Sequence, residues 1–381
     1  MGMGMTSKER VKTALRHQEP DRVPIGEIIV ECEMVEQVLG HESFLRGHFK
    51  TDKAYWEGYR DEVVDSLKRD TVELAKKLEL DVVPVWLVPS KHQEIKRPKQ
   101  LAEGVYEDEK GNILQYSDVS KWLITVKDAD AERKWRLEDF VDEEPPEPDE
   151  SELEMIRYVM HELGDTHYVI GRHGGDPTFP VLGGQERGLM MWVEEPEIIK
   201  RAIEVATERV LARDRWLIRE GVDAVHPDSD YSGTNGPLVN PRILRELSLP
   251  AMRRHCEASH SQGVQIIKHA CGNNWAIMDL FVEAGYDAYQ GIQGGAGMDV
   301  RRLKEAYGDR IAIWGGVQIE SLVLGTPEDI RRDVEYALRY AAPGGGLVLS
   351  SSHAIVPGSK YDNFMAMLDV AREKGVYPIS V

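Results

Sequence analysis

In the stretch Val264-Gln265-Ile266-Ile267-Lys268-His269-Ala270-Cys271-Gly272, a short apolar run ends in polar, reactive side chains. Side chains two positions apart on an extended segment point to the same side, so the imidazole of His269 and the thiol of Cys271 face together. Amphipathic helical patterns flank the run at 241–262 and 274–284. The stretch therefore predicts a buried strand between two helices, with two candidate metal ligands at its carboxyl end.

The alternation of apolar strand and amphipathic helix continues along the chain in both directions. Eight runs are predicted to be strands: Val23–Ile28, Asp81–Leu87, Tyr168–Arg172, Val222–His226, Val264–His269, Tyr286–Gln290, Ile311–Trp314 and Gly346–Ser350. Helical patterns between them span Glu195–Arg219, Pro241–Gln262, Asn274–Ala284, Val300–Tyr307 and Pro327–Tyr340. Eight such units predict an α/β fold, a (β/α)8 TIM-type barrel, rather than two open sheets.

Further segments are attached to this repeating pattern. Thr6 and Glu9 are spaced as a capping box that opens a short helix, and 34–77 is largely helical, which predicts an N-terminal helical extension. Residues 104–127 predict a β-hairpin insertion, and the acidic, proline-rich stretch 142–150 indicates a solvated linker. None of these segments requires a second domain, so we expect residues 1–381 to form a single one.

Charge and composition exclude several classes of partner. The chain of 381 residues carries 47 basic and 66 acidic side chains, a net charge of −19. This surplus argues against a nucleic acid or an anionic membrane as partner, and no apolar stretch approaches the roughly 20 residues that span a bilayer. The three cysteines make no disulfide framework, and the first residues show no secretory signal. We therefore expect a cytoplasmic protein.

A TIM-type barrel places its active site at the carboxyl ends of the strands, and polar side chains gather there in this sequence. The expected substrate-binding residues are Glu27, Trp86, His173, Tyr231, Gln290, Trp314 and Gln318. The expected catalytic groups are Asp228, Asp230 and His353, and the expected metal ligands are His269, Cys271 and His353. Purely structural roles remain open for several of these residues. His269 and Cys271 could be a structural pair, one aspartate could cap a helix, and Trp86, Trp314 and Tyr231 could be packing residues.

Several motifs of the chain resemble those of the uroporphyrinogen decarboxylase superfamily. They are Thr6-Ser7-Lys8-Glu9-Arg10, Asp21-Arg22-Val23-Pro24, Gly221-Val222-Asp223-Ala224, Gly236-Pro237-Leu238-Val239-Asn240-Pro241, His269-Ala270-Cys271-Gly272-Asn273, Trp314-Gly315-Gly316, Gly325-Thr326-Pro327 and Pro343-Gly344-Gly345-Gly346. The resemblance extends over nearly the whole length and implies a TIM-type barrel. It also implies one of two chemistries: cofactor-free decarboxylation of uroporphyrinogen, or zinc-dependent methyl transfer to or from a corrinoid protein.

The chain departs from the decarboxylase pattern at two places. The Arg-Gln-Ala-Gly-Arg stretch that binds substrate carboxylates has no match, since 24–32 is Pro-Ile-Gly-Glu-Ile-Ile-Val-Glu-Cys. The catalytic aspartate after the second strand falls near Val88. An anionic macrocycle needs several cations, and acids and aromatic residues are expected at this site instead. The methyltransferase branch is the better match.

The zinc motif of that branch is His-x-Cys with a later cysteine after the last strand. His269 and Cys271 match its first part, and His353 stands where the late cysteine is expected. A His/Cys/His set suits zinc, although Glu27, Glu31, Asp228 or Asp230 could participate in its place. Asp228 or Asp230 could also orient a ligand imidazole or protonate a leaving oxygen.

The sequence thus predicts a zinc-dependent methyltransferase. It would move a methyl group between a small O-, N- or S-methyl compound and a corrinoid protein, or a thiol or folate acceptor. The corrinoid belongs to a separate partner, since no Asp-x-His-x-x-Gly attachment motif is present. The alternative is a metal-independent decarboxylase, and a non-catalytic binding protein is the third choice. Family resemblance implies a monomer or a homodimer.

Overall fold

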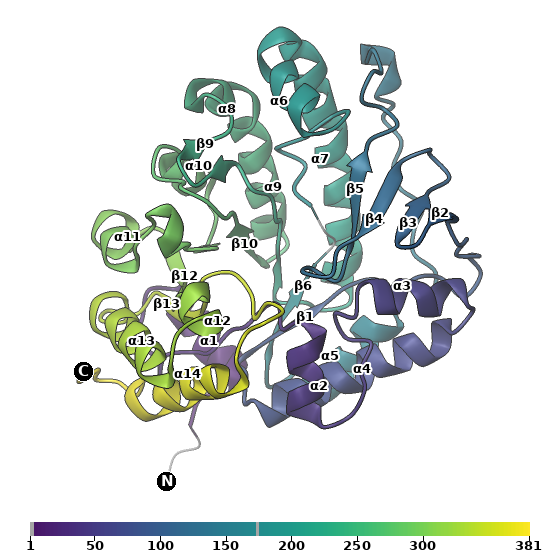
Figure 1. Cartoon of the computed structure of the whole chain (residues 1–381). Helices are drawn as coiled ribbons and strands as arrows, with labels where there is room; N and C mark the ends of the chain where they lie inside the picture. The colour runs from purple at the N-terminus through teal and green to yellow at the C-terminus, as the bar shows by residue number, and fades with distance from the viewer. Residues whose placement is uncertain (1–3, 173–174) are drawn as a thin grey trace.

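Apolar runs without polar alternation become the strands of a central parallel sheet, as expected for strands covered on both faces. The computed structural model describes residues 4–172 and 175–381. The sheet has seven strands in the order β1-β6-β7-β10-β11-β12-β13 (Figure 1). They are β1 (Val82–Val85), β6 (Tyr168–Gly171), β7 (Ala224–Val225), β10 (Gln265–His269), β11 (Ala288–Gln290), β12 (Ala312–Val317) and β13 (Leu347–Ser351).

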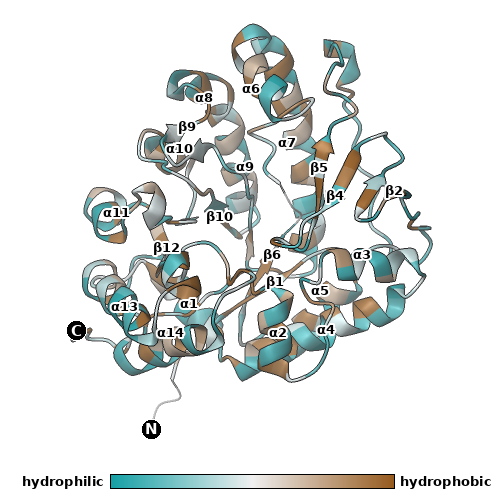
Figure 2. Cartoon of the chain, in the orientation of Figure 1, coloured by the Kyte–Doolittle hydropathy of each residue, from teal (hydrophilic) through white to brown (hydrophobic). Residues whose placement is uncertain are grey.

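Helices follow the strands and cover the outside of the sheet (Figure 1). They are α5 (Glu154–Leu163), α6 (Gln185–Glu194), α7 (Pro196–Arg219), α8 (Pro241–Leu247), α9 (Leu249–Ser261), α10 (Met278–Ala284), α11 (Val300–Tyr307), α12 (Ile319–Val323), α13 (Pro327–Ala341) and α14 (Tyr361–Lys374). Figure 2 shows apolar residues on the central strands and polar ones on the outer faces of the helices. This mixed α/β arrangement, with its parallel sheet, is consistent with a TIM-type fold.

The first predicted strand, residues 23–28, is not a regular strand. Ile25 makes one isolated parallel bridge to Leu349 of β13, and its carbonyl oxygen accepts from the N–H of Asp81, just before β1, at 2.8 Å. The bridge consists of two hydrogen bonds, because Leu349 accepts from the N–H of Gly26 and donates to the carbonyl oxygen of Pro24, each at 2.9 Å. The segment thus lies between the two edges of the sheet but pairs with each only briefly.

The predicted helix 241–262 is divided into α8 and α9. Pro250 is the second residue of α9, where a missing N–H costs nothing, but the same ring would clash inside a continuous helix. The break therefore follows from one residue. The two helices remain on the outside of the sheet between β7 and β10.

The N-terminal part supplies helices α1 (Ser7–Leu15), α2 (Cys32–Leu39), α3 (Phe49–Trp56) and α4 (Arg60–Lys77). The expected hairpin at 104–127 is part of a larger antiparallel sheet, β2 (Lys99–Ala102), β3 (Val105–Glu107), β4 (Ile113–Tyr116) and β5 (Leu123–Lys127). Short elements complete the fold: β8 (Ser232–Gly233), β9 (Gly236–Pro237) and two 3-10 turns, Leu137–Asp139 and Gly294–Ala296. The antiparallel sheet packs on α3, where the ring of Phe49 contacts Tyr106 of β3 and Tyr116 of β4 (Figure 1).

The acidic stretch expected to be a solvated linker has exposed carboxylates, and ion pairs attach it to α7. Asp142 pairs with Arg201 at 2.7 Å and Glu147 pairs with Arg219 at 2.7 Å, while Glu144 pairs with Arg215. We call residues 142–147 the acidic strap. Arginines along one helix thus hold the strap across the surface, and its two prolines line the cavity described below.

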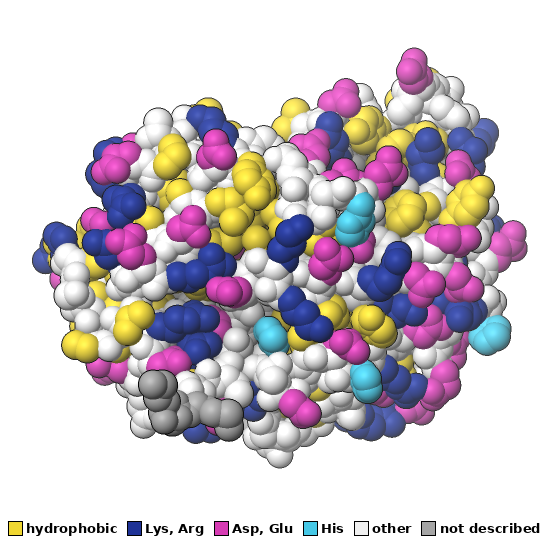
Figure 3. Space-filling view, turned by 90° about the horizontal axis from the view of Figure 1, so that it is seen from below, with side chains coloured by type: hydrophobic (Ala, Val, Ile, Leu, Met, Phe, Trp, Pro, Cys, Tyr) yellow, Lys and Arg dark blue, Asp and Glu magenta, His cyan; other side chains and the backbone are white. Residues whose placement is uncertain are grey.

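The surface mixes charges of both signs, as Figure 3 shows for the face seen from below. Acidic residues outnumber basic ones over the whole chain, 66 to 47. No helix within residues 4–172 and 175–381 is long and apolar enough to cross a bilayer.

Candidate active site

The turn that leaves β10 holds His269 and Cys271 in a fixed relation. His269 is the last residue of the strand, and the side-chain amide of Asn274 donates to two carbonyl oxygens of the turn, each at 3.0 Å. Gly272 has a φ of +82°, and a Cβ there would lie 2.2 Å from the carbonyl oxygen of Ser232. Only glycine fits this approach of two backbones, which orients the preceding thiol.

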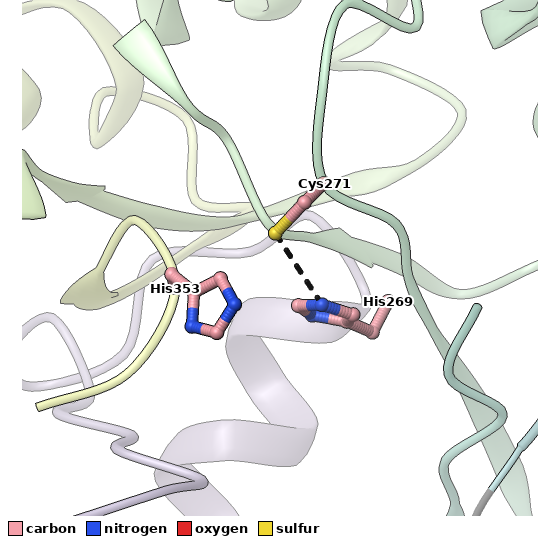
Figure 4. Close-up of side chains that lie close together, drawn as sticks. All are labelled: His269, Cys271 and His353. Carbon is pink, nitrogen blue, oxygen red and sulfur yellow. Dashed lines mark hydrogen bonds between the residues drawn. The ribbon is translucent and has the colours of Figure 1, made fainter. Parts of the chain in front are cut away.

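His353, from the loop that follows β13, completes a cluster with His269 and Cys271 (Figure 4). The Sγ atom of Cys271 lies 3.5 Å from Nε2 of His269, and one ligand atom from each of the three residues lies within 4.8 Å of the others. The two rings meet edge to face, with centroids 5.6 Å apart. Residues 84 positions apart, 269 and 353, are thus brought together by neighbouring parts of the fold.

Gln290 supports both histidines from β11. Its position is opposite His269 in the strand register, and its side-chain oxygen accepts a hydrogen bond from Nδ1 of that ring. Its amide nitrogen donates to the carbonyl oxygen of His353 at 3.1 Å. Gln290 is 2% exposed and lies behind the histidines. This position differs from the substrate-binding role that the sequence predicts for it. The bond to Nδ1 leaves Nε2 of His269 as the ligand atom.

The cluster has the chemistry that a zinc ion requires. Burial lowers the pKa of His269 and of His353, so both imidazoles are neutral at neutral pH. Burial raises the pKa of the Cys271 thiol, and only a bound cation would make the thiolate its stable form. The Nδ1 atom of His353 is buried and has no hydrogen-bond partner within the described ranges. Two imidazoles, one of them with an unpartnered nitrogen, and one thiol make a three-donor set that fits zinc.

A cavity of about 1010 Å³ opens over the cluster. Of the residues expected at the site, it is lined by Trp86, Asp228, Asp230, His269 and His353. Tryptophan and proline side chains form much of its remaining wall, together with both acidic and basic groups. Its size and mixed lining are those of a small-molecule site.

The two aspartates of the site differ in their availability. Asp228 accepts from Arg172 at 2.5 Å and from the N–H of Gly175 at 2.8 Å. Burial opposes ionisation of Asp228, but the Arg172 guanidinium outweighs it and holds the pKa below its usual range. Asp230 accepts from the N–H of Cys271 at 2.8 Å and lies 3.9 Å from Nε2 of His269. Its side chain is 58% exposed, so Asp230 is the acid free to act on a ligand.

Glu27 lies outside the main cavity, against the end of β13. Its carboxylate accepts from the hydroxyl of Ser351 at 2.9 Å and also from the N–H of that residue. Burial raises the pKa of Glu27 to about 7. It borders a small neighbouring cavity of about 30 Å³ rather than the space above the histidines.

Replacing Glu27 by glutamine should change how stability depends on pH. The folded-state pKa of about 7 exceeds the ordinary 4.5, so folding favours the protonated carboxyl. That contribution is fully present below pH 4.5 and is lost as the pH rises through 7, by about 3 kcal/mol. Denaturant unfolding across this range should show the decline in the wild type and not in Glu27→Gln. A parallel decline in both proteins would contradict the raised pKa.

Four expected substrate-binding residues lie elsewhere or outside the described residues. Trp314 is fully buried within the sheet, and its indole N–H donates to the carbonyl oxygen of Gly26 at 2.7 Å, so it is a packing residue. Tyr231 is also fully buried, with its hydroxyl on Asp176 at 2.9 Å. Gln318 accepts from the N–H of Gly294 at 2.8 Å and does not line the cavity. His173 lies outside the described residues.

Sequence reasoning missed several residues at the site. Arg46 and Arg172 line the cavity, which corrects the expectation that cations would be absent from it. His226 is 1% exposed, its ring centroid lies 6.0 Å from that of His269, and neither ring nitrogen has a partner among residues 4–172 and 175–381. Arg172 and His226 end two of the predicted strands, as His269 does. Their position at the carboxyl end of a strand could have identified both as candidate site residues.

Comparisons with known proteins agree on the family. The family model described as "Uroporphyrinogen decarboxylase (URO-D)" matches residues 127–374. Uroporphyrinogen decarboxylase from Methylococcus capsulatus is 26% identical over 57% of this chain and 63% of its own length. The protein of the same name from Alkalilimnicola ehrlichii is 24% identical over 60% of this chain and 64% of its own length. The matched region thus spans less than two thirds of these curated relatives.

The solved structure of a methyltransferase from Methanosarcina mazei has the same fold. It superposes with a TM-score of 0.68 at 16% identity, covering 97% of this chain and 99% of that one. At this identity the likeness speaks for the fold alone. The family model covers more than half of the sequence, so the chain belongs to the uroporphyrinogen decarboxylase family of enzymes.

Proposed function

We propose that this protein is a zinc-dependent methyltransferase that moves a methyl group between a small O-, N- or S-methyl compound and a corrinoid carried by a separate protein. The observation that carries the proposal is the convergence of His269, Cys271 and His353 at the base of a cavity large enough for a small molecule. Cofactor-free decarboxylation has no use for a buried thiol between two imidazoles. Such a set suits zinc.

The donor set leaves room for a substrate atom. Nε2 of His269, Sγ of Cys271 and one nitrogen of His353 would be the three protein ligands, and His269 and His353 also line the cavity from which a substrate atom would approach. When bound there, zinc withdraws charge from a substrate heteroatom as its bond to carbon breaks, or keeps a thiol acceptor in its thiolate form.

The remaining residues have separate tasks. Gln290 fixes the ring orientation and tautomer of His269 through Nδ1. Asp230 can deliver a proton to a leaving oxygen or nitrogen, because its carboxylate is exposed to the cavity beside the cluster. Asp228, held by Arg172, stays ionised and serves to position that arginine.

Metal-independent decarboxylation is the second candidate, and the two arginines of the cavity favour it. Cationic groups bind the carboxylates of such substrates. However, Arg46 contacts Glu31 at 3.0 Å, and Arg172 contacts Asp228 at 2.5 Å. Each guanidinium thus has its charge balanced by a neighbouring carboxylate, which weakens its attraction for a polyanionic macrocycle.

The two candidates predict different reactions for the purified protein. Zinc-loaded protein mixed with cob(I)alamin and a panel of methyl ethers, methylamines and methyl thioethers should form methylcobalamin, measured by absorbance. The His353→Ala variant should lose most of this activity, and chelation should abolish it. Release of carbon dioxide from uroporphyrinogen by metal-free protein, with no methyl transfer from any donor, would overturn the proposal.

A further inference from the structure

The cavity above the cluster holds three arginines in different electrostatic states. Arg46 and Arg172 are engaged by Glu31 and Asp228, as described. Arg213 lines the same cavity from α7 and is exposed. It has no ion pair or hydrogen bond within the described parts of the chain. Its guanidinium is therefore the cavity cation that remains available for a ligand.

The helix face that carries Arg213 also carries an aromatic surface. Trp216 is three residues further along α7, so the two side chains lie on the same side of the helix, and both line the cavity. Trp86, at the end of β1, contributes a second indole to the lining. Pro145 and Pro146 of the acidic strap add rigid apolar wall.

A third tryptophan that lines the cavity, Trp122, is already in contact with other side chains. The ring of His48 stacks on it at 4.1 Å between centroids, and the guanidinium of Arg46 lies 5.6 Å from its centroid. Trp86 and Trp216 have no such ring or cation neighbour among residues 4–172 and 175–381. Both indoles are half-buried and line the cavity, where they and the guanidinium of Arg213 can contact a ligand.

We propose that Arg213 binds the single carboxylate of a flat, largely apolar substrate whose body lies against Trp216 and Trp86. The inference deepens the proposed function, on which it rests, by naming the class of methyl donor: a small aromatic acid that carries the methyl group at the end remote from its carboxylate. The carboxylate on Arg213 would orient the other end of the molecule toward His269 and His353, which line the same cavity.

Charge explains why one acidic group is accepted and several are not. The cavity lining includes the carboxylates of Glu31, Glu152, Asp228 and Asp230, and the whole chain has a net charge of −19. An anion that enters is repelled unless it reaches a cation without a partner, where a charge-assisted hydrogen bond compensates. Arg213 supplies one such place, which suits a monoacid and disfavours a macrocycle with many carboxylates.

The inference can be tested by binding alone, without activity. We would titrate metal-free protein with para-methoxybenzoate, its neutral amide para-methoxybenzamide, the amine para-methoxybenzylamine and the ring-free acid methoxyacetate, following tryptophan fluorescence and calorimetry. The benzoate should bind about tenfold or more tightly than each of the other three, as expected for one charge-assisted hydrogen bond and one stacked ring.

Two variants test whether Arg213 and Trp216 cause the preference for para-methoxybenzoate. Arg213→Met should remove the advantage of the benzoate over the amide, and Trp216→Leu should remove its advantage over methoxyacetate. Arg209→Met is the matched control, because Arg209 lies one turn earlier on α7 and donates to the carbonyl oxygen of Val141 at 3.3 Å outside the cavity. This variant should bind all four probes as the wild type does.

Each other outcome would overturn the inference. Equal binding of benzoate and amide, tighter binding of the amine, or an unchanged preference in Arg213→Met would remove the anion site. Equal binding of methoxyacetate would remove the aromatic surface. Failure of the proposed function is recognised separately, since a protein without zinc or methyl transfer could still show the acid preference, and a zinc methyltransferase could lack it.

Discussion

The Cys271→Ala variant should fold, yet retain almost none of the zinc, about one ion per chain, that we expect the wild type to bind. The thiol is one of three proposed ligands, and the loss of even a hydrogen-bond partner of a ligand costs roughly 10- to 100-fold in metal affinity. Loss of the ligand itself should exceed that cost. Metal analysis after gel filtration measures the zinc content, and methyl transfer should fall in proportion.

Two further measurements separate a lost ligand from a damaged fold. Cobalt(II) in place of zinc should show a thiolate-to-metal absorption band in the wild type that is missing in Cys271→Ala. Cys256→Ala is the matched control, because this thiol is also buried but lies on α9, outside the cluster. It should keep both the zinc and the band. Full zinc occupancy in Cys271→Ala would refute the assignment.

A second large effect is expected at the buried ion pair on the other face of β10. Lys268 is fully buried and pairs with Asp176, which also accepts from the hydroxyl of Tyr231 at 2.9 Å. The ammonium lies 4.5 Å from the centroid of the Tyr231 ring. Asp176→Asn would leave this charge buried and unpaired, so the free energy of unfolding should fall by about 3–5 kcal/mol. Denaturant titration measures the change.

An exposed pair provides the comparison. Glu208 accepts two hydrogen bonds from Arg254, at 2.6 and 2.9 Å, and both side chains are more than half exposed. Glu208→Gln should cost no more than about 1 kcal/mol, because water already solvates the two charges. Similar losses in the two variants would show that burial does not set the strength of the Lys268 pair. Asp176→Asn should also reduce zinc content, since Lys268 and His269 are adjacent on one strand.

Hydrophobic pattern and strand-end position predicted the parts of the fold that depend on local sequence. Seven of the predicted strands occur as strands of one parallel sheet, and His269, Cys271 and His353 lie together. The segment 23–28 differs because a ladder depends on partners from distant strands, which the apolar run alone does not report. The break at Pro250 was visible in the sequence and follows from the proline ring.

Side-chain direction was harder to predict, since strands buried on both faces show no polar alternation. The pattern therefore does not show that Trp314 of β12 points into the packed interior, and Tyr231, in the loop after β7, is buried there as well. Lys268 has its counter-ion 92 positions away at Asp176, and no local pattern reveals such a partner. In the sequence, Arg213 does not differ from the other arginines of its helix. Only its position in the lining of the cavity distinguishes it.

The acidic strap makes the wall of the cavity sensitive to the salt concentration of the solution. Its carboxylates meet the arginines of α7 at the surface, where dissolved ions screen each attraction over about 8–10 Å. Rising salinity should therefore weaken the attachment of the strap and loosen the wall that Pro145 and Pro146 contribute, while the hydrogen bond between Gln290 and His269 lies in the interior, away from that surface. We expect salt to act on the wall of the cavity and not on the packing that holds His269.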